Sequence, residues 1–481
     1  MNQVLIDSCG VSTSLRFTDV SFFIEPNNPD DHKSSCCAGI YRTVECTEVP
    51  LRNVISAKVA SGAIEVQYLV RKGKESRLNL VMTSGTVQNE DSARAKKWCE
   101  ALLLVAYQGA NPFKNLKVLV NPHGGKGKGR ALYVSKVEPI FLAAGCTLDV
   151  TYTTHSGHAI EIAREMKLGY DALVTVSGDG LIHEVLNGIN QHEHRDQAFC
   201  IPIAPIPTGS GNGMSLNLLG LKDGLDVCAA ALNVLKGQPL KTDLFAFTQG
   251  DRCRVSFMSQ TIGITADLDI ETEHLRWMGD IRFIVGYIRA IIARKSCPIE
   301  LSMKVVDQDK SRMMDALHAR RVGESPIPSS LPSSLLSDDK KPDSASSSHE
   351  EEWTQFKRPI LWMYAGQGPF VSRALMQFPV SLADDGLIDI SIQEITSRRA
   401  LLWAMDGAEE GRTYWINTNR YFKASAYRAK PLASKGTLVV DGEQVPFEAF
   451  QVDVLSRLGT FLAPYPYYAP EFLVRDIQGK T

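Results

Sequence analysis

Ala172-Leu-Val-Thr-Val-Ser-Gly-Asp-Gly-Leu-Ile-His-Glu184 is the stretch that decides the fold. The apolar run Ala172–Val176 is typical of a strand buried on both faces, and residues 181–187 are expected to form the helix that follows. Asp179 would then stand at the C-terminal edge of a parallel sheet, where open α/β folds bind ligands. The stretch therefore predicts a doubly wound α/β domain with a site beside Asp179. The alternative is that Asp179 only caps the helix after it.

Two more glycine-rich segments have the same setting. Asn121-Pro-His-Gly-Gly-Lys-Gly-Lys-Gly129 follows the apolar run Leu116–Val120, and Pro207-Thr-Gly-Ser-Gly-Asn-Gly213 follows Ile201–Ile206. Glycine lets backbone N–H groups approach phosphate oxygens, and the N-terminus of a following helix adds positive potential. One such loop alone is better explained as a tight turn. Three in succession at strand ends predict a nucleotide held by backbone amides.

The spacing of the glycines excludes two common nucleotide motifs. Residues 124–129 are followed by Arg130 and Ala131, where a Walker A loop needs Lys and then Ser or Thr. The alternating glycines of residues 209–213 lack the G-x-G-x-x-G spacing of a dinucleotide-binding turn. The site therefore belongs to neither class.

In this order, NPHGGKGKG, SGDGLIHEVLNG and PTGSGNGMS resemble the catalytic domain of the diacylglycerol-kinase superfamily of lipid kinases. Within that superfamily, ADLDIETEHLRWMGDIRF at residues 266–283 resembles the sphingosine (long-chain base) kinases, as do DDGLID at 384–389 and VDGE at 440–443. The matches run from about Asn115 to Val454 with one insertion. The resemblance implies an ATP-dependent kinase that phosphorylates the primary hydroxyl of a sphingoid base.

The resemblance also implies the nucleotide site. We expect Asp179 to be the general base, Glu184 to contact the nucleotide, and Arg276 and Arg282 to hold the ATP phosphates, although both arginines could equally be exposed helix charges. The other implied nucleotide contacts are Asn121, Pro122, His123, Thr153, Thr154, His155, Ser156, Gly157, Gly209, Ser210, Gly211, Asp441, Gly442 and Glu443. Mg²⁺ is expected because clustered phosphates need a divalent cation. The sequence does not identify its protein ligands.

The acceptor lipid is predicted from its charge. A sphingoid base carries an ammonium group beside its hydroxyl, so a carboxylate can hold it, whereas a diacylglycerol offers no such handle. Asp269 matches the family's residue for this role. Apolar positions at helical spacing within residues 277–292 predict either core packing or a lipid entrance. The other residues expected around the acceptor are Ser177, Gly178, Asp179 and Gly180.

A chain of 481 residues is too long for one core. The expected fold class is α/β plus β: a small N-terminal PH-like α+β module, a doubly wound α/β nucleotide-binding domain, and a C-terminal antiparallel β-sandwich domain for the lipid. Short alternating runs that end in a helix at Ser92–Tyr107 predict the first module, for which a packing role without a ligand is the alternative. The expected boundaries are 1–113, 114–241 and 242–463, a disordered insertion rich in Ser, Pro, Asp and Lys at 307–352, and a tail at 464–481.

Composition limits the setting and the partners. The formal net charge of −2 gives no basic field for nucleic acid. The 10 cysteines form no C-x-x-C pairs, which argues against a zinc site or a disulfide framework and favours the cytoplasm. We expect neither a membrane span nor a signal peptide, so a lipid kinase would meet the membrane surface peripherally. Adjacent Cys36 and Cys37 are candidates for reversible palmitoylation, with unmodified thiols as the alternative.

Three other functions remain to be weighed. A diacylglycerol or ceramide kinase is the alternative among lipid kinases, and the match around Asp269 disfavours it. A catalytically silent lipid-binding or scaffold protein would be expected to lose part of the three loops, which are intact. A nicotinamide-nucleotide kinase shares the loop arrangement but needs no lipid entrance.

Overall fold

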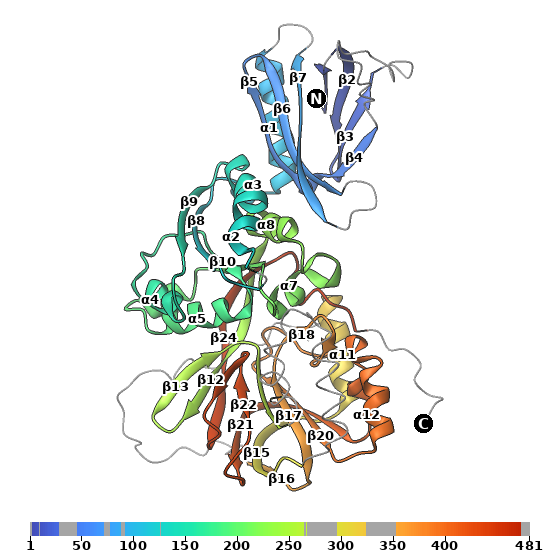
Figure 1. Ribbon diagram of the computed structural model, residues 1–481. Helices are drawn as coiled ribbons and strands as arrows, with labels where there is room; N and C mark the ends of the chain where they lie inside the picture. The colour runs from blue at the N-terminus through green and yellow to red at the C-terminus, as the bar shows by residue number, and fades with distance from the viewer. Residues whose placement is uncertain are drawn as a thin grey trace, which may run out of the picture.

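Three consecutive regions make up the fold, and Figure 1 shows them one below another: an N-terminal module, an α/β region and a strand-rich region. The computed structural model of the chain describes residues 2–8, 10–27, 46–71, 77–87, 92–125, 127–263, 266, 296–323 and 353–472.

The N-terminal module is an antiparallel sheet packed against one helix. Its strand order is β4-β3-β2-β1-β7-β6-β5. Trp98 and Leu102 lie four residues apart on α1 and are buried in the module's core, where Trp98 makes an edge contact with Phe17 at 5.7 Å between ring centroids. The predicted helix at 92–107 is confirmed. The elements are β1 (Gln3–Ser8), β2 (Val11–Phe17), β3 (Ser21–Pro26), β4 (Thr47–Pro50), the 3₁₀ turn η2 (Leu51–Asn53), β5 (Val54–Ala60), β6 (Ala63–Arg71), β7 (Leu78–Val87) and α1 (Ser92–Tyr107).

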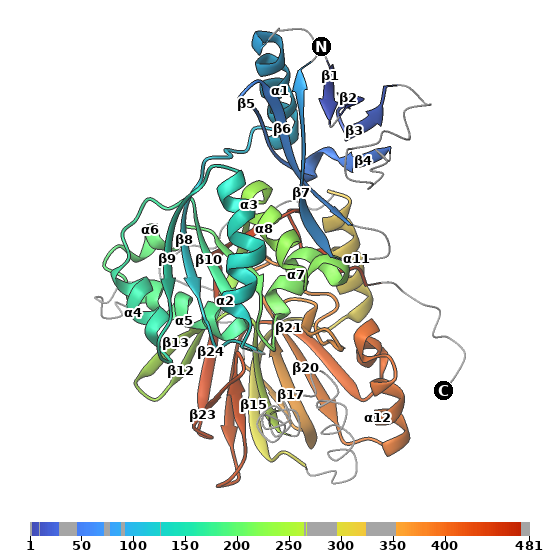
Figure 2. The ribbon, with the colours of Figure 1, turned by 45° about the horizontal axis from the view of Figure 1, so that its top comes forward.

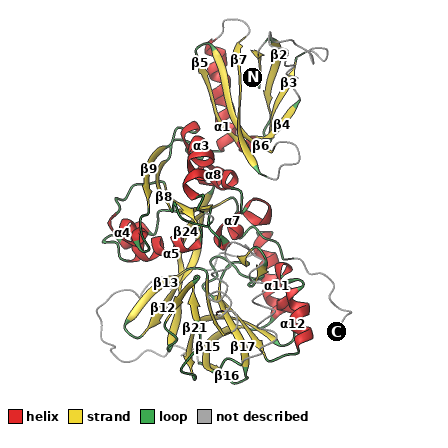
Figure 3. Ribbon diagram, in the orientation of Figure 1, coloured by secondary structure: helices red, strands yellow, loops and turns green. Residues whose placement is uncertain are grey.

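The α/β region contains parallel strands in the order β11-β10-β8-β9. Helices cover both faces of these strands, which explains why β8, β10 and β11 are almost wholly apolar and buried (Figure 3). Helices α3 and α8 pack on one face, and α4, α5 and α7 pack on the other. The elements are β8 (Asn115–Val120), α2 (Gly129–Leu132), the π-helical turn η3 (Tyr133–Val137), α3 (Glu138–Ala143), β9 (Thr147–Tyr152), α4 (His158–Glu165), β10 (Ala172–Ser177), α5 (Asp179–Asn190), α6 (Arg195–Ala198), β11 (Ile203–Pro207), α7 (Gly213–Asp223) and α8 (Val227–Lys236).

The strand-rich region is mostly antiparallel and encloses its own apolar core. Its strands are β12 (Gln238–Gln249), β13 (Arg252–Ser256), β14 (Ser259–Gly263), β15 (Ile299–Asp307), β16 (Thr354–Phe356), β17 (Ile360–Gly366), β18 (Phe370–Ser372), β19 (Leu375–Met376), β20 (Ile388–Glu394), β21 (Asn419–Pro431), β22 (Leu438–Val440), β23 (Glu443–Val445) and β24 (Phe450–Ala463). Its helices and 3₁₀ turns are α11 (Lys310–Arg321), α12 (Arg398–Met405), η5 (Ala408–Glu410) and η6 (Arg412–Trp415).

One long strand joins the two lower regions. The first residues of β24 pair with β21, most of its length pairs with β12, and Phe461 near its end pairs with Ile203 of β11. The parallel and antiparallel strands therefore belong to one mixed sheet. The sequence predicts a separate second domain, but the hydrogen bonding shows no break between the two sets of strands.

Part of the predicted insertion is ordered. Residues 310–321, which composition assigns to a disordered segment, form helix α11. Asp309 caps this helix, and Met313, Met314 and Leu317 are buried beneath it. The predicted start of the insertion is therefore wrong, because three apolar side chains on one helical face offset the cost of ordering a polar segment. Residues 324–352 lie outside the described part of the chain.

Candidate active site

The three glycine-rich loops leave neighbouring parallel strands at the same edge of the sheet. A side chain at Gly178 would collide with the carbonyl oxygen of Gly211, and one at Gly209 would collide with the backbone of Gly178. A side chain at Gly125 would collide with the carbonyl oxygen of Thr208. These glycines are therefore needed for the loops to pack against one another. From the sequence, they were explained only by the approach of backbone N–H groups to phosphate oxygens.

Asp179 is the first residue of α5, and its carboxylate binds the start of a different helix. Oδ2 accepts a hydrogen bond from the N–H of Gly213 at 2.6 Å, and Oδ1 accepts one from the N–H of Met214 at 3.1 Å. Both donors belong to the first turn of α7, so Asp179 anchors α7 and does not cap its own helix. Burial raises the pKa of Asp179 to about 6; the two N–H donors oppose this rise, and the charge of Asp441 adds to it.

Glu184, one turn further along α5, is used in the same way. Its Oε1 accepts from the N–H of Gly157 at 3.0 Å, and its Oε2 accepts from the N–H of Ala159 at 3.1 Å, at the start of α4. Helix N-termini favour negative charge, so both carboxylates of α5 are stabilised by the helices that they hold. These bonds fix Gly157 and the start of α4, and the predicted contact of Glu184 with the nucleotide stays a prediction.

The predicted nucleotide segment 153–157 follows β9. Thr153 is buried, and its N–H donates to the carbonyl of Val120 at 2.9 Å, which ties the segment to the end of β8. Thr154, His155 and Ser156 are exposed. The segment therefore lies beside the first glycine-rich loop and presents three polar side chains to solvent.

Asn121 shapes the first loop as a turn. Its side-chain Oδ1 accepts from the N–H of His123 at 3.0 Å, and its own N–H donates to the carbonyl of Val176 at 3.1 Å. Asn121 and Pro122 are half-buried, while His123 is exposed. The loop is thus fixed to β10 and leaves His123 accessible.

Asn212 closes the third loop in a similar way. Its side-chain amide accepts from the N–H of Gly209 at 3.2 Å and donates to the carbonyl of Gly209 at 2.9 Å. Ser210 and Gly211 are exposed at the tip. The hydroxyl oxygen of Thr208, at the base of the loop, is buried and has no hydrogen-bond partner.

Ser177, Gly178, Asp179 and Gly180, four of the residues predicted to surround the acceptor, lie at the same junction. Ser177 is the buried last residue of β10, and Gly178 and Gly180 flank Asp179. The three glycine-rich loops therefore meet at one edge of the sheet, and Asp179 belongs to the second of them.

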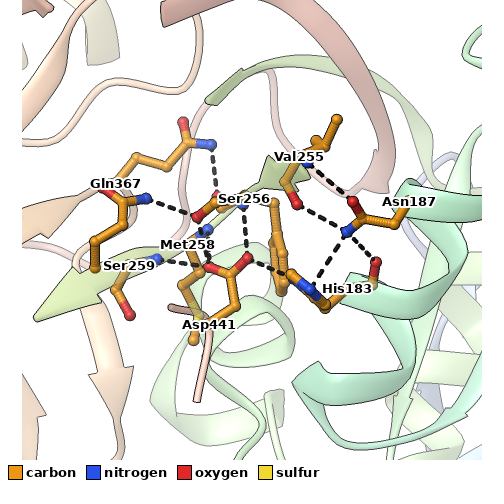
Figure 4. Close-up of polar contacts among 10 residues, drawn as sticks. His183, Asn187, Val255, Ser256, Met258, Ser259, Gln367 and Asp441 are labelled. Atoms are coloured by element: carbon orange, nitrogen blue, oxygen red, sulfur yellow. Dashed lines mark hydrogen bonds and ion pairs between the residues drawn. The ribbon is translucent and has the colours of Figure 1, made fainter. Parts of the chain in front are cut away.

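The carboxylate of Asp441 is fully buried and is satisfied by protein donors (Figure 4). The donors are the hydroxyl of Ser256, the N–H groups of Phe257, Met258 and Ser259, and Nδ1 of His183, at 2.8–3.1 Å. The sequence assigns Asp441 to the nucleotide. The structure instead gives this side chain a structural role, because five donors occupy its acceptor positions.

Gly442 and Glu443 are exposed beside this buried residue. A carboxylate oxygen of Glu443 lies 3.8 Å from the position that a Cβ atom on Gly180 would occupy. The β22–β23 hairpin therefore brings Glu443 from the strand-rich region to the first turn of α5, next to Asp179. This agrees with the predicted return of the motif at 440–443 to the site.

The motif DDGLID at 384–389 serves another purpose. Nζ of Lys423 lies 2.8 Å from Asp385 and 3.1 Å from Asp389, and Asp243 accepts from the N–H of Gly386 at 2.7 Å. Burial, with the charge of Asp385, raises the pKa of Asp243 to about 8. The motif therefore builds a buried ionic network within the strand-rich region.

Comparison with known proteins places this geometry in a family. A profile described as the diacylglycerol kinase catalytic domain matches residues 115–247, and a domain of unknown function, DUF7493, matches residues 6–108. Sphingoid long chain base kinase 4 of Schizosaccharomyces pombe is 33% identical over 423 residues, which cover 86% of this chain and 88% of the relative. The chain belongs to the sphingoid long chain base kinase family.

More distant members agree. Sphingoid long chain base kinase 5 of Saccharomyces cerevisiae is 31% identical, over 75% of this chain and 60% of the relative. Human sphingosine kinase 1 is 28% identical, over 70% of this chain and 88% of the relative. The family assignment predicted from the six sequence motifs is thereby confirmed.

Two polar residues on α5, His183 and Asn187, were not predicted from the sequence. Beside His183, Asn187 accepts from the N–H of Val255 at 2.9 Å and donates to the carbonyl of Val255 at 2.9 Å (Figure 4). The signal was present in the sequence, since Asp179, His183 and Asn187 recur every four residues and therefore share one face of α5.

Several predicted site residues lie outside the described part of the chain. They are Asp269, Arg276, Arg282, the apolar stretch 277–292, and the lipidation candidates Cys36 and Cys37. Among the residues that the structure does describe, no three His, Cys, Asp or Glu side chains group as a metal ion would need. Nor does any helix within the described ranges have the length and apolarity to cross a membrane.

Proposed function

We propose that the chain is an ATP-dependent lipid kinase that transfers the γ-phosphate of ATP to the primary (C1) hydroxyl of a sphingoid base, giving products of the sphingosine 1-phosphate type. The observation that carries this proposal is the 33% identity with a sphingoid long chain base kinase over 86% of the chain. The meeting of three glycine-rich loops at one sheet edge supports it, because open α/β folds bind ligands there. A diacylglycerol or ceramide kinase is the alternative.

The nucleotide would lie over the junction of the loops. The junction fits a phosphate group, because the exposed tip of the third loop offers backbone donors and the buried hydroxyl of Thr208 has no protein partner. The proposed contacts are Asn121, Pro122, His123, Thr154, His155, Ser156, Gly209, Ser210, Gly211, Gly442 and Glu443. Glu184 would also contact the nucleotide, and its bond to Gly157 would hold the end of the segment 153–157.

Asp179 is the proposed general base. A carboxylate has about four acceptor positions, so Asp179 can bind two N–H groups of α7 and still accept the proton of the lipid hydroxyl. A pKa of about 6 suits this task, because a general base works best when its pKa lies near the working pH. The anchoring to α7 would also hold the carboxylate in one orientation.

Phosphoryl transfer needs charge neutralisation as well as a base. Mg²⁺ favours phosphate oxygens with one or two carboxylates, and the exposed carboxylate of Glu443 beside Gly180 fits this requirement. When bound, the ion would neutralise charge on the transferred phosphoryl group. Arg276 and Arg282 would hold the phosphates of ATP.

The acceptor would be recognised by its ammonium group, through Asp269. Residues 277–292 would form part of the lipid entrance, and the protein would take its substrate from a membrane surface. Palmitoylation of Cys36 and Cys37 would strengthen this contact, because two acyl chains anchor a protein more stably than one. A PH-like identity for residues 1–113 and a β-sandwich domain at 242–463 remain predictions.

Purified protein with labelled ATP, Mg²⁺ and a panel of sphingoid bases, ceramide and diacylglycerol tests the proposal. We expect label in the sphingoid 1-phosphates. Transfer to diacylglycerol or ceramide in preference would support the alternative, and ADP formation without a lipid product would contradict both.

A further inference from the structure

The tip of the β22–β23 hairpin is a two-residue turn, Asp441-Gly442, because Val440 pairs with Glu443. Both turn residues have positive φ angles, 49° and 84°, as a type I′ hairpin turn requires. An Asp-Gly tip of this kind normally extends into solvent. Here Gly442 does so, but the side chain of Asp441 is fully buried.

The buried carboxylate fastens the hairpin tip to two regions at once. Four of its five donors come from residues 256–259, the corner between β13 and β14 in the same strand-rich region. The fifth is Nδ1 of His183, at 2.8 Å, which comes from α5 in the α/β region. The contact with His183 therefore ties the tip of the hairpin to the helix that begins with Asp179.

The ring of His183 is held on both sides. A carboxylate can only accept, so the proton must lie on Nδ1. On its other side, Nε2 lies 3.3 Å from the amide nitrogen of Asn187, which donates to the carbonyls of His183 and Val255 at 2.9 Å each. Asn187 is in turn fixed to Val255 of β13. The direction of the Nδ1–H bond toward Asp441 is therefore set by α5.

One face of α5 thus carries the polar contacts of the site. Asp179, His183 and Asn187 recur every four residues and bind, in order, the start of α7, the hairpin tip and β13. Because the tip is fixed to this face, Glu443 stands beside Gly180 in the first turn.

We propose that His183 is a positioning residue: its bond to Asp441 holds the Asp441-Gly442 turn on α5 and thereby places Glu443 where it meets the nucleotide. His183 itself touches no substrate in this arrangement. The inference rests on the proposed kinase function, and it predicts that removing the bond weakens nucleotide binding through Glu443.

Two substitutions of His183 distinguish the loss of its hydrogen bond to Asp441 from the loss of side-chain volume. His183→Asn keeps an N–H donor at the δ position, so Asp441 retains its partner. His183→Gln is also polar and neutral, but its donor lies one bond further out. We expect His183→Gln to weaken ADP binding and raise the KM for ATP by about tenfold or more, the effect of losing a hydrogen bond to a charged group. His183→Asn should behave as the wild-type protein does.

Glu443→Ala tests the route of the effect. Titration calorimetry with ADP and Mg²⁺ should show weaker binding in this variant, and combining it with His183→Gln should add little to the larger single effect. Asn233→Ala is the control, because it removes another buried bond, from the amide to the carbonyl of Leu462 at 2.7 Å, away from the loops. It should lower thermal stability and leave ADP binding unchanged.

The outcomes are distinct. Wild-type affinity for ADP in His183→Gln or in Glu443→Ala would overturn the inference, as would equal losses in His183→Gln and His183→Asn or fully additive losses in the double variant. Failure of the wild-type protein to bind ADP would instead contradict the proposed function.

Discussion

Two helices pack the α/β region against its neighbours, and their polar contacts lie at different places in the molecule. Helix α8 carries the N-terminal module, mainly through buried apolar surface. Ile55, Leu69 and Leu78 of the module share one apolar cluster with the α/β region, and β7 reaches α8 (Figure 2). Helix α5 shares an apolar cluster with Val255 and Phe257 of the strand-rich region and adds hydrogen bonds from His183 and Asn187.

The polar contacts of α8 lie at its two ends. At the N-terminus, Asp226 caps the helix and also accepts from the N–H of Leu78 at 2.6 Å. At the C-terminus, the buried ammonium of Lys236 donates to the carbonyls of Arg52, Val54 and Ala106 of the module. These contacts attach both ends of α8 to the N-terminal module.

The two helices differ in what their polar contacts adjoin. None of the α8 contacts named above involves a glycine-rich loop, whereas the α5 contacts include Asp179 and adjoin Glu443. We therefore expect changes at α8 to alter unfolding and changes at α5 to alter nucleotide binding and turnover.

Lys236→Met should give the largest change in stability. The substitution leaves three buried carbonyls without their donor, so the free energy of unfolding should fall by about 3 kcal/mol. The measurement is urea unfolding of the full chain, followed by titration with ADP. An unchanged unfolding midpoint would contradict a stabilising role for the α8 contacts. Lost ADP affinity in the folded variant would contradict the expectation that α8 does not affect nucleotide binding.

The pH dependence of turnover should come from α5. Burial raises the pKa of Asp179 to about 6, and a base acts only when it is deprotonated, so kcat should rise with pH through this value and level off above it. Below it the rate should fall about tenfold per unit. Lys236→Met should keep the same profile. A rate that is flat between pH 5 and about 7 would argue against Asp179 as the base.

Asn187→Ala should have the smallest effect. It removes the two bonds to Val255, and we expect a loss of about 1–2 kcal/mol in unfolding free energy. ADP binding should weaken less than in His183→Gln, since Asn187 reaches the hairpin only through the ring of His183. A larger effect on ADP than that of His183→Gln would show that β13, and not the hairpin tip, is the important attachment.

The sequence was most informative where structure is local. The helix at 92–107 and the strands before each glycine-rich loop were predicted to within one or two residues, because apolar periodicity and glycine mark their ends. It failed for α11, where Met313, Met314 and Leu317 were hidden in a polar composition.

The partners of the site carboxylates could not be predicted. Asp179 and Gly213 are 34 residues apart, and His183 and Asp441 are 258 residues apart. Sequence identifies a carboxylate but not the donor that it meets, because that depends on which strands become neighbours. For this reason the sequence predicts Asp179 as a general base or a helix cap without identifying its partners on α7, and it assigns Asp441 to the nucleotide.

The turnover of Asp179→Asn is the decisive measurement of whether Asp179 acts as the general base. The amide cannot act as a base, so kcat for a sphingoid base at saturating ATP should fall by about 10²–10⁴. Its oxygen can still accept from one N–H of α7, and ADP binding, measured on the same sample, should persist. A kcat close to that of the wild-type protein, with ADP bound normally, would contradict the account.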